Sequence, residues 1–185
     1  MRRAELEIRD REMIKAILDL CKVINVGLHD EEYPYMYPTN YGYTFEDDLV
    51  IYMHHAPTGH KLDLMAKNPK VCVTAYTFAD HIINPRSPTK SKHDYRSVMA
   101  FGIMEEVFYG TPEYRVCWQT LLECNGRKAA ESFLEKDHSA YLRNFKIVCK
   151  AENVIGKSQN PLKSLSEIQL PTEPAYDLAQ VPLVT

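Results

Sequence analysis

The sequence predicts a mainly β protein, a small antiparallel barrel into which a few helices are inserted. Two observations predict it. About six segments show the alternation or the β-branched composition of strands, and polar turns rather than helices join most of them. A parallel βαβ fold would need a helix between most pairs of strands, so the pattern speaks against it.

The predicted strands are short and rich in β-branched and aromatic residues. They cover residues 23–28, 33–43, 49–53, 71–76, 95–109 and 145–150, and the segment 145–150 is expected to be the last strand of the chain. Gly102 lies inside the long run 95–109, which predicts a bend or a bulge in that strand.

The densest feature is a stripe of tyrosines between Tyr33 and Tyr43. All of them occupy odd positions, so a strand would place them on one face. Such a face either packs in the barrel or a dimer, or forms a platform for a planar ligand. Pro34 and Pro38 cannot donate ladder hydrogen bonds, so their nitrogens should face an unpaired edge, a bulge or a ligand.

Periodicity of 3.6 residues predicts helices over residues 10–21, 57–68 and 111–124, with a further short helix near 127–134. Asp10 is suited to cap the first helix, and Thr111 followed by Pro112 marks the start of the third. Residues 80–92 contain two prolines and mixed charge, which predicts a long loop.

The composition excludes several classes of protein. A chain of 185 residues with 45% hydrophobic residues and a net charge of −3 suits one ordinary domain, not collagen, a coiled coil or a disordered chain. No run reaches the ~18 apolar residues of a membrane span. No basic stripe favours nucleic acid. Charges stand where a secretory signal would have its apolar core, so we expect a cytoplasmic protein.

Two further features concern the cysteines and the end of the chain. The five cysteines form no Cys-x-x-Cys pair, so we expect idle or buried thiols in a reducing compartment. Four prolines follow Gly156 in an otherwise polar stretch. We therefore expect one domain over residues 1–157 and a proline-rich tail over 158–185 that lies across the surface or a partner subunit.

The segment His54–Leu64 carries the most chemical information. It joins a strand end, a short loop and a helix start, where free N–H groups and the helix dipole attract anions. His60 and Lys61 have the wrong sign for this position, each at a cost of about 0.3–1 kcal/mol. A bound phosphate, approached closely at Gly59, would account for them. The alternative is a solvated lysine and histidine on a surface turn.

A metal site is the remaining interpretation of this segment, because His54, His55 and His60 lie close in sequence. Adjacent residues of a strand point to opposite faces, however, and no cysteine, aspartate or glutamate completes a recognisable ligand set. We therefore predict no metal.

Three segments together resemble one family. Pro38–Tyr43, His54–Asp63 and Tyr95–Val98 with Phe101-Gly102 are similar to the nitroimidazole-resistance (Nim-type) proteins, which belong to the pyridoxamine-phosphate-oxidase-like split barrels. The similarity runs from about Met1 to Lys157. The Gly-His-Lys segment is its most specific part, and the segment Tyr95–Val98 its least specific.

The resemblance implies a six-stranded antiparallel split β-barrel of the FMN-binding type, a homodimer, and a flavin in the groove between subunits. It implies that the flavin phosphate and ribityl chain are held by His54, His55, Ala56, Gly59, His60 and Lys61, and that the ring is faced by Thr39, Asn40, Ser97 and Val98. His55 departs from the many relatives that have serine there, so an imidazole would replace a hydroxyl contact. The long tail either covers the groove or selects FAD over FMN.

The resemblance also implies a flavin-dependent reductase that acts on a small nitro-aromatic acceptor, as in nitroimidazole reduction to the amine, with a nicotinamide or another donor supplying electrons. No residue stands out as the catalytic acid or base, although His54 and His60 are candidates by position. Two alternatives remain: a flavin-binding dimer without turnover, acting as a carrier or sensor, and a haem-binding split barrel.

Overall fold

The computed structural model describes residues 3–82 and 92–159. Within these ranges nine strands form one antiparallel sheet, which confirms the mainly β fold class. The strands are β1 (Glu7–Ile8), β2 (Ile24–Leu28), β3 (Tyr35–Thr39), β4 (Gly42–Phe45), β5 (Leu49–His55), β6 (Lys70–Ile82), β7 (Lys92–Val107), β8 (Arg143–Cys149) and β9 (Val154–Ser158).

The number of strands exceeds the predicted six for three reasons. The tyrosine-rich segment is broken into β3 and β4, the two-residue β1 pairs with β9, and β9 itself follows the segment that was expected to be the last strand. Residue 158 still belongs to β9, residue 159 follows it, and residues 160–185 of the predicted tail lie outside the described residues.

The order of the main path is β3-β2-β6-β7-β8-β5-β4. Strands β3 and β4 therefore stand at its two ends, yet only Asn40 and Tyr41 separate them in the chain. This short connection brings the two ends of the sheet together, as a barrel requires. Pro38 lies on β3, an end strand of this path, as its missing N–H predicts.

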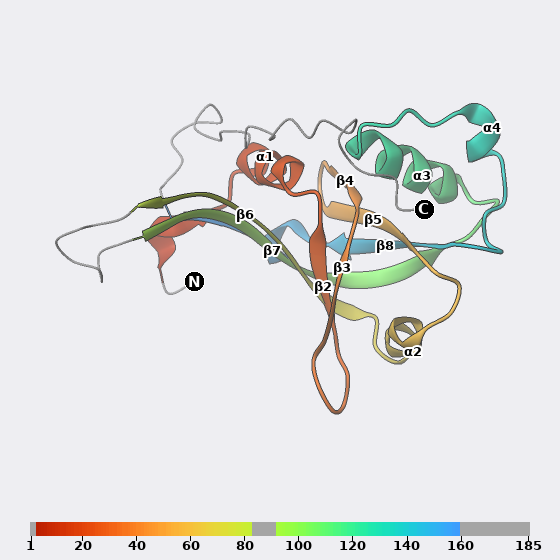
Figure 1. Cartoon of the computed structure of the whole chain (residues 1–185), viewed down its shortest axis with the longest axis horizontal. Coiled ribbons are helices and arrows are strands. Elements are labelled where there is room, and N and C mark those ends of the chain that lie inside the picture. Colours follow the sequence, from red (N-terminus) through yellow and green to blue (C-terminus); the bar gives the residue numbers. More distant parts are fainter. Residues whose placement is uncertain (1–2, 83–91, 160–185) are drawn as a thin grey trace, which may run out of the picture.

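The helices are α1 (Arg11–Leu20), α2 (His60–Lys67), α3 (Pro112–Cys124) and α4 (Glu131–Leu134). In Figure 1, α1 and α3 lie on one side of the strands and α2 on the other. The Asp10 carboxylate caps α1 by accepting from the Met13 N–H at 2.9 Å, and Pro112 opens α3, both as predicted. Helix α4 is a single turn, shorter than the segment 127–134 predicted for it.

The hairpin of β6 and β7 is the longest element (Figure 1). Both strands run into the predicted loop, of which residues 80–82 and 92 are strand and 83–91 lie outside the described residues. The register shift lies between Phe78 and Asp80 of β6 rather than at Gly102. Near Gly102 strand β7 instead changes its second partner, from β9 to β8, and this change is what splits the barrel.

The apolar residues form two clusters. The larger one fills the barrel and includes Ile17, Ile24 and Ile51, each without exposed surface. The smaller one lies between the sheet and α3, around Trp118 and Cys117. The position of α3 therefore decides the shape of this second compartment.

A close backbone contact at Gly42 sets that position. A Cβ atom at Gly42 would lie 2.5 Å from the Thr120 carbonyl oxygen and 2.7 Å from the Leu121 Cα, both of which belong to the backbone of α3. Backbone atoms cannot rotate away, so only glycine allows α3 to pack this closely on β4.

We predict that G42A lowers the free energy of unfolding by about 2–3 kcal/mol, because α3 must shift to admit the methyl group. The measurement is a urea unfolding curve. G27A is the matched control, since a Cβ there meets only ordinary contacts of 3.5 Å or more. Equal unfolding midpoints for G42A and G27A would contradict the proposed role of Gly42.

Candidate functional site

Strand β5 delivers two adjacent histidines to opposite faces of the sheet. His55 is 3% exposed and points into the barrel, where its ring lies 5.3 Å from that of Phe145. His54 points to the other face, where its ring stacks on Trp118 at 5.6 Å. The alternation of side chains along a strand produces this arrangement.

A chain of hydrogen bonds links Lys61, His55 and Tyr37. The Lys61 Nζ lies 3.2 Å from His55 Nδ1, and His55 Nε2 lies 3.1 Å from the Tyr37 hydroxyl oxygen. The ammonium can only donate, so Nδ1 accepts and the Nε2–H donates to Tyr37. The Tyr37 hydroxyl in turn donates to the Met53 sulfur at 3.9 Å.

Burial disfavours the charged forms of the ionisable groups in this hydrogen-bonded chain. Burial, and after it the positive charge of Lys61, lower the pKa of His55 to about 3. Burial raises the pKa of the Tyr37 hydroxyl far above its usual value. Burial also lowers the pKa of Lys61 itself. At neutral pH, His55 is therefore an uncharged support for the Lys61 ammonium, not an acid.

Within residues 3–82 and 92–159, no opposite charge pairs with the Lys61 ammonium. Among the described residues no carboxylate forms an ion pair with Lys61, whose other neighbour is the Tyr37 ring, 4.8 Å from Nζ. Lys61 lies in the first turn of α2, which has no side-chain cap. A half-buried cation beside unpaired helix N–H groups is a site for an anion.

Gly59 opens this helix. Its φ of 139° is a conformation that favours glycine, and a Cβ added there would meet nothing within 4 Å. The backbone in front of the first turn of α2 therefore borders open space, where a ligand can approach it closely.

His60 has a different partner from the one expected. Its Nε2 lies 2.9 Å from the Asp30 carboxylate, and this contact lowers the pKa of Asp30. The aspartate thus accounts for one of the two cations at the start of α2. Of these two basic residues, only Lys61 lacks a carboxylate partner among the described residues.

The other predicted residues are distributed over several elements. Ala56 is exposed in the loop before α2. Thr39 ends β3, and the Asn40 amide donates to the Lys22 carbonyl oxygen at 3.2 Å. Val98 is buried in the barrel, while Ser97 lies on the outer face of β7 opposite Tyr76. Asn40 borders the same cavity as His54 rather than the Lys61 site.

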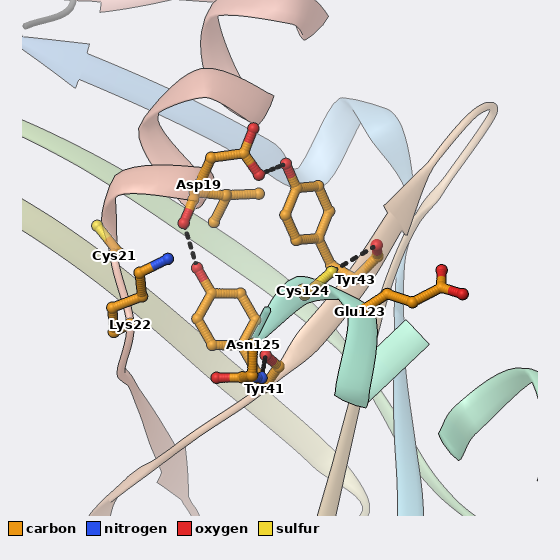
Figure 2. A pocket seen from close by; sticks show the side chains of 9 residues that line it. Asp19, Cys21, Lys22, Tyr41, Tyr43, Glu123, Cys124 and Asn125 are labelled. Carbon is orange, nitrogen blue, oxygen red and sulfur yellow. Dashed lines mark hydrogen bonds between the residues drawn. The ribbon is translucent and has the colours of Figure 1, made fainter. Parts of the chain in front are cut away.

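Two residues of these sites, Tyr37 and Trp118, were not predicted as site residues. Tyr37 belongs to the tyrosine stripe, which alone did not tell it apart from its neighbours. Tyr41 and Tyr43 of the same stripe bind the end of α1, through the Leu18 carbonyl at 2.7 Å and the Asp19 carboxylate at 2.6 Å (Figure 2). For these two tyrosines the packing interpretation holds. Trp118 carried no signal beyond its place in an amphipathic helix.

Metal sites, disulfides and membrane-spanning helices are not indicated by the described residues. No group of three histidine, cysteine, aspartate or glutamate residues among the described residues could hold a metal ion. All five cysteines are free. No helix in residues 3–82 and 92–159 is long and apolar enough to cross a membrane.

Comparison with known proteins identifies the family. The sequence profile of the pyridoxamine 5'-phosphate oxidase family matches residues 10–116, more than half of the chain. The chain belongs to this family of flavin-binding split-barrel proteins. No curated protein is significantly similar to the chain.

Solved structures share the fold. A proposed 5-nitroimidazole antibiotic resistance protein from Bacteroides thetaiotaomicron superposes with a TM-score of 0.67 at 22% identity, over 83% of this chain and 86% of that protein. The flavocytochrome Anf3 from Azotobacter vinelandii gives 0.64 at 21% identity, over 98% and 90%. An FAD- and heme-binding protein from Mycobacterium smegmatis gives 0.62 at 20% identity, over 88% and 78%. At such identities the likeness concerns the fold alone.

Because His55 is buried in its neutral form, the free energy of unfolding depends on pH. The folded pKa of His55 lies below the unfolded value of 6.5, so the stabilisation is complete above pH 6.5 and is lost as the pH falls toward 3. We predict a loss of about 2 kcal/mol between pH 6.5 and 5 from this residue. H55N should flatten that slope in urea unfolding curves, apart from the smaller contribution of His54, whose pKa burial also lowers.

The exposed His29 offers a matched control, H29N. An H55N protein with the full slope of the unaltered chain would mean that His55 is not the group that titrates.

Proposed function

We propose that this protein is a Nim-type, flavin-dependent reductase that acts on a small nitro-aromatic acceptor. The observation that carries the proposal is the Lys61 ammonium, held by His55 and Tyr37 at the uncapped start of α2 with no carboxylate beside it among the described residues. The family match and the resemblance of the motifs support a flavin as the ligand that supplies the missing negative charge.

The residues present fit a flavin phosphate. The ammonium of Lys61 and the N–H groups of His60 and Lys61 offer donors, and Gly59 leaves open space before them. FMN carries a terminal phosphate, and FAD carries a pyrophosphate, so the site suits either cofactor. Thr39, Asn40 and Ser97, with Val98 behind them, are the proposed ring side.

The flavin, when bound, supplies the electron transfer, because it accepts electrons from a donor and passes them on. The chain's own residues bind and orient it. His55 is uncharged at neutral pH, so it does not act as a general acid, and its role is to position Lys61. The two acid–base candidates are His54 and His60. His60 is exposed and pairs with Asp30, so it is better placed than His54 to exchange protons with solvent.

The experiment compares flavins with and without a phosphate. K61M should weaken FMN binding roughly 10–100-fold, the effect of losing one charge-assisted hydrogen bond, while riboflavin binding stays unchanged. Binding is measured by flavin fluorescence. K67M, at the exposed end of the same helix, is the control. In anaerobic stopped-flow mixing, the reduced holoprotein should be reoxidised rapidly by a nitroimidazole.

The outcomes separate the candidates. A protein that neither binds nor retains flavin would overturn the whole proposal. Flavin binding with no reoxidation by the nitroimidazole would favour the second candidate, a carrier or sensor without turnover. The uncharged state of His55 at neutral pH supports this candidate, since His55 beside Lys61 then offers no general acid. A Soret band in the purified protein would point to haem instead.

We also propose that the chain acts as a homodimer. An apolar surface on the outer face of β6 and β7 supports this, formed by Tyr76, Phe78, Met99, Phe101 and Ile103, which are 40–66% exposed. Apolar patches of this kind on a sheet usually mark an interface. A groove of about 650 Å³ borders it, lined in part by Met36 and Phe101. Ser97 lies on the same face, so a flavin beside it would also touch the second subunit.

F101E should therefore convert the protein to a monomer, because it buries a charge in the proposed interface. Light scattering coupled to size-exclusion chromatography measures the mass. Y141E, at a tyrosine that is 78% exposed elsewhere on the surface, should leave the dimer intact. A monomeric unaltered chain at micromolar concentration would contradict the dimer.

A further inference from the structure

The face of the sheet opposite Lys61 holds a separate cavity of about 410 Å³. It lies between β5 and α3. Most of its wall is apolar or aromatic, and its lining includes His54, Trp118, Leu121, Phe133 and Leu142. A cavity of roughly 150 Å³ already admits benzene, so this one has room for one substituted ring.

Aromatic rings shape the wall. Trp118 is 3% exposed and stacks on His54, and the Phe133 ring meets it edge to face at 5.0 Å. Planar apolar walls of this kind favour a flat ligand, because rings gain most contact area against other rings. The cavity is thus suited to an aromatic molecule.

Three buried polar atoms beside this wall lack a hydrogen-bond partner within the described residues. They are Trp118 Nε1, His54 Nδ1 and Asn144 Oδ1. Asn144 faces His54 across the β5–β8 ladder, so both side chains leave the sheet on the same face. Buried polar atoms nearly always have partners, and three together call for an occupant with polar groups.

The donors available decide which polar group fits. The amide nitrogens of Asn40 and Asn125 already donate to backbone carbonyls. The free donors at the cavity are the indole N–H of Trp118 and the guanidinium of Arg127, which no ion pair holds in the described part of the chain. The Trp118 N–H and the Arg127 cation match an anionic group that only accepts hydrogen bonds, whereas Asn144 Oδ1, itself only an acceptor, takes no bond from such a group.

We infer that this cavity binds a single-ring aromatic carboxylate, with the ring packed beside Trp118 and Phe133 and the carboxylate toward Arg127. The site is separate from the proposed flavin phosphate site, since His54 and His55 leave β5 on opposite faces, although Asn40 of the proposed ring side also lines it. The protein would then bind a second ligand, an aromatic carboxylate, besides the flavin of the proposed function.

Trp118 is the only tryptophan of the chain, so its fluorescence reports on this cavity alone. Titration of the purified full-length protein with benzoate should change the emission saturably, whereas acetate, which has no ring, should not. R127Q should weaken benzoate binding tenfold or more and leave the binding of neutral benzamide nearly unchanged. K128Q, the neighbouring exposed cation, is the matched control.

Three outcomes would overturn the inference: no saturable response to benzoate, equal weakening in R127Q and K128Q, or competition between benzoate and FMN. The last would mean that the flavin ring occupies the cavity. K61M separates this test from that of the proposed function, because it should lose FMN affinity and keep benzoate affinity.

Discussion

The alternation of side chains along β5 is the constraint on which both sites depend. His54 and His55 are neighbours in the chain, but the strand sends one into the compartment under α3 and the other into the barrel. A slip of one residue in the pairing of β5 with β8 would exchange these environments. The seven-residue ladder from Leu49 to His55, filled on its inner face by Ile51 and Met53, holds this register.

The inner site combines one charge with neutral supports. Lys61 is held between an imidazole that burial keeps uncharged and a tyrosine ring, so nothing in the described chain neutralises it. In a medium of low polarity such a charge interacts strongly with any anion that reaches it. His55 also reaches the Tyr37 hydroxyl and so couples Lys61 to Tyr37.

Much of the fold was predictable because local periodicity and capping agree with the tertiary structure. Helices α1, α2 and α3 and the cores of β2, β5, β6, β7 and β8 lie where their patterns predict. The failures have a common cause. Strand β9 and the break between β3 and β4 exist because distant segments pair with them, as β7 and β1 do with β9. The length of the β6–β7 hairpin likewise depends on the pairing of its two strands with each other.

The amino-acid sequence by itself determined the class of fold, the helix start at Gly59 and the cation at Lys61, because these depend on residues close together in the chain. Only the tertiary structure decided what each side chain meets. It joined Lys61 to Tyr37 through His55, paired His60 with Asp30, and placed Trp118 over His54, across separations of 24 to 64 positions. Such contacts follow from strand register and from the packing of α3 against Gly42, neither of which a local pattern encodes.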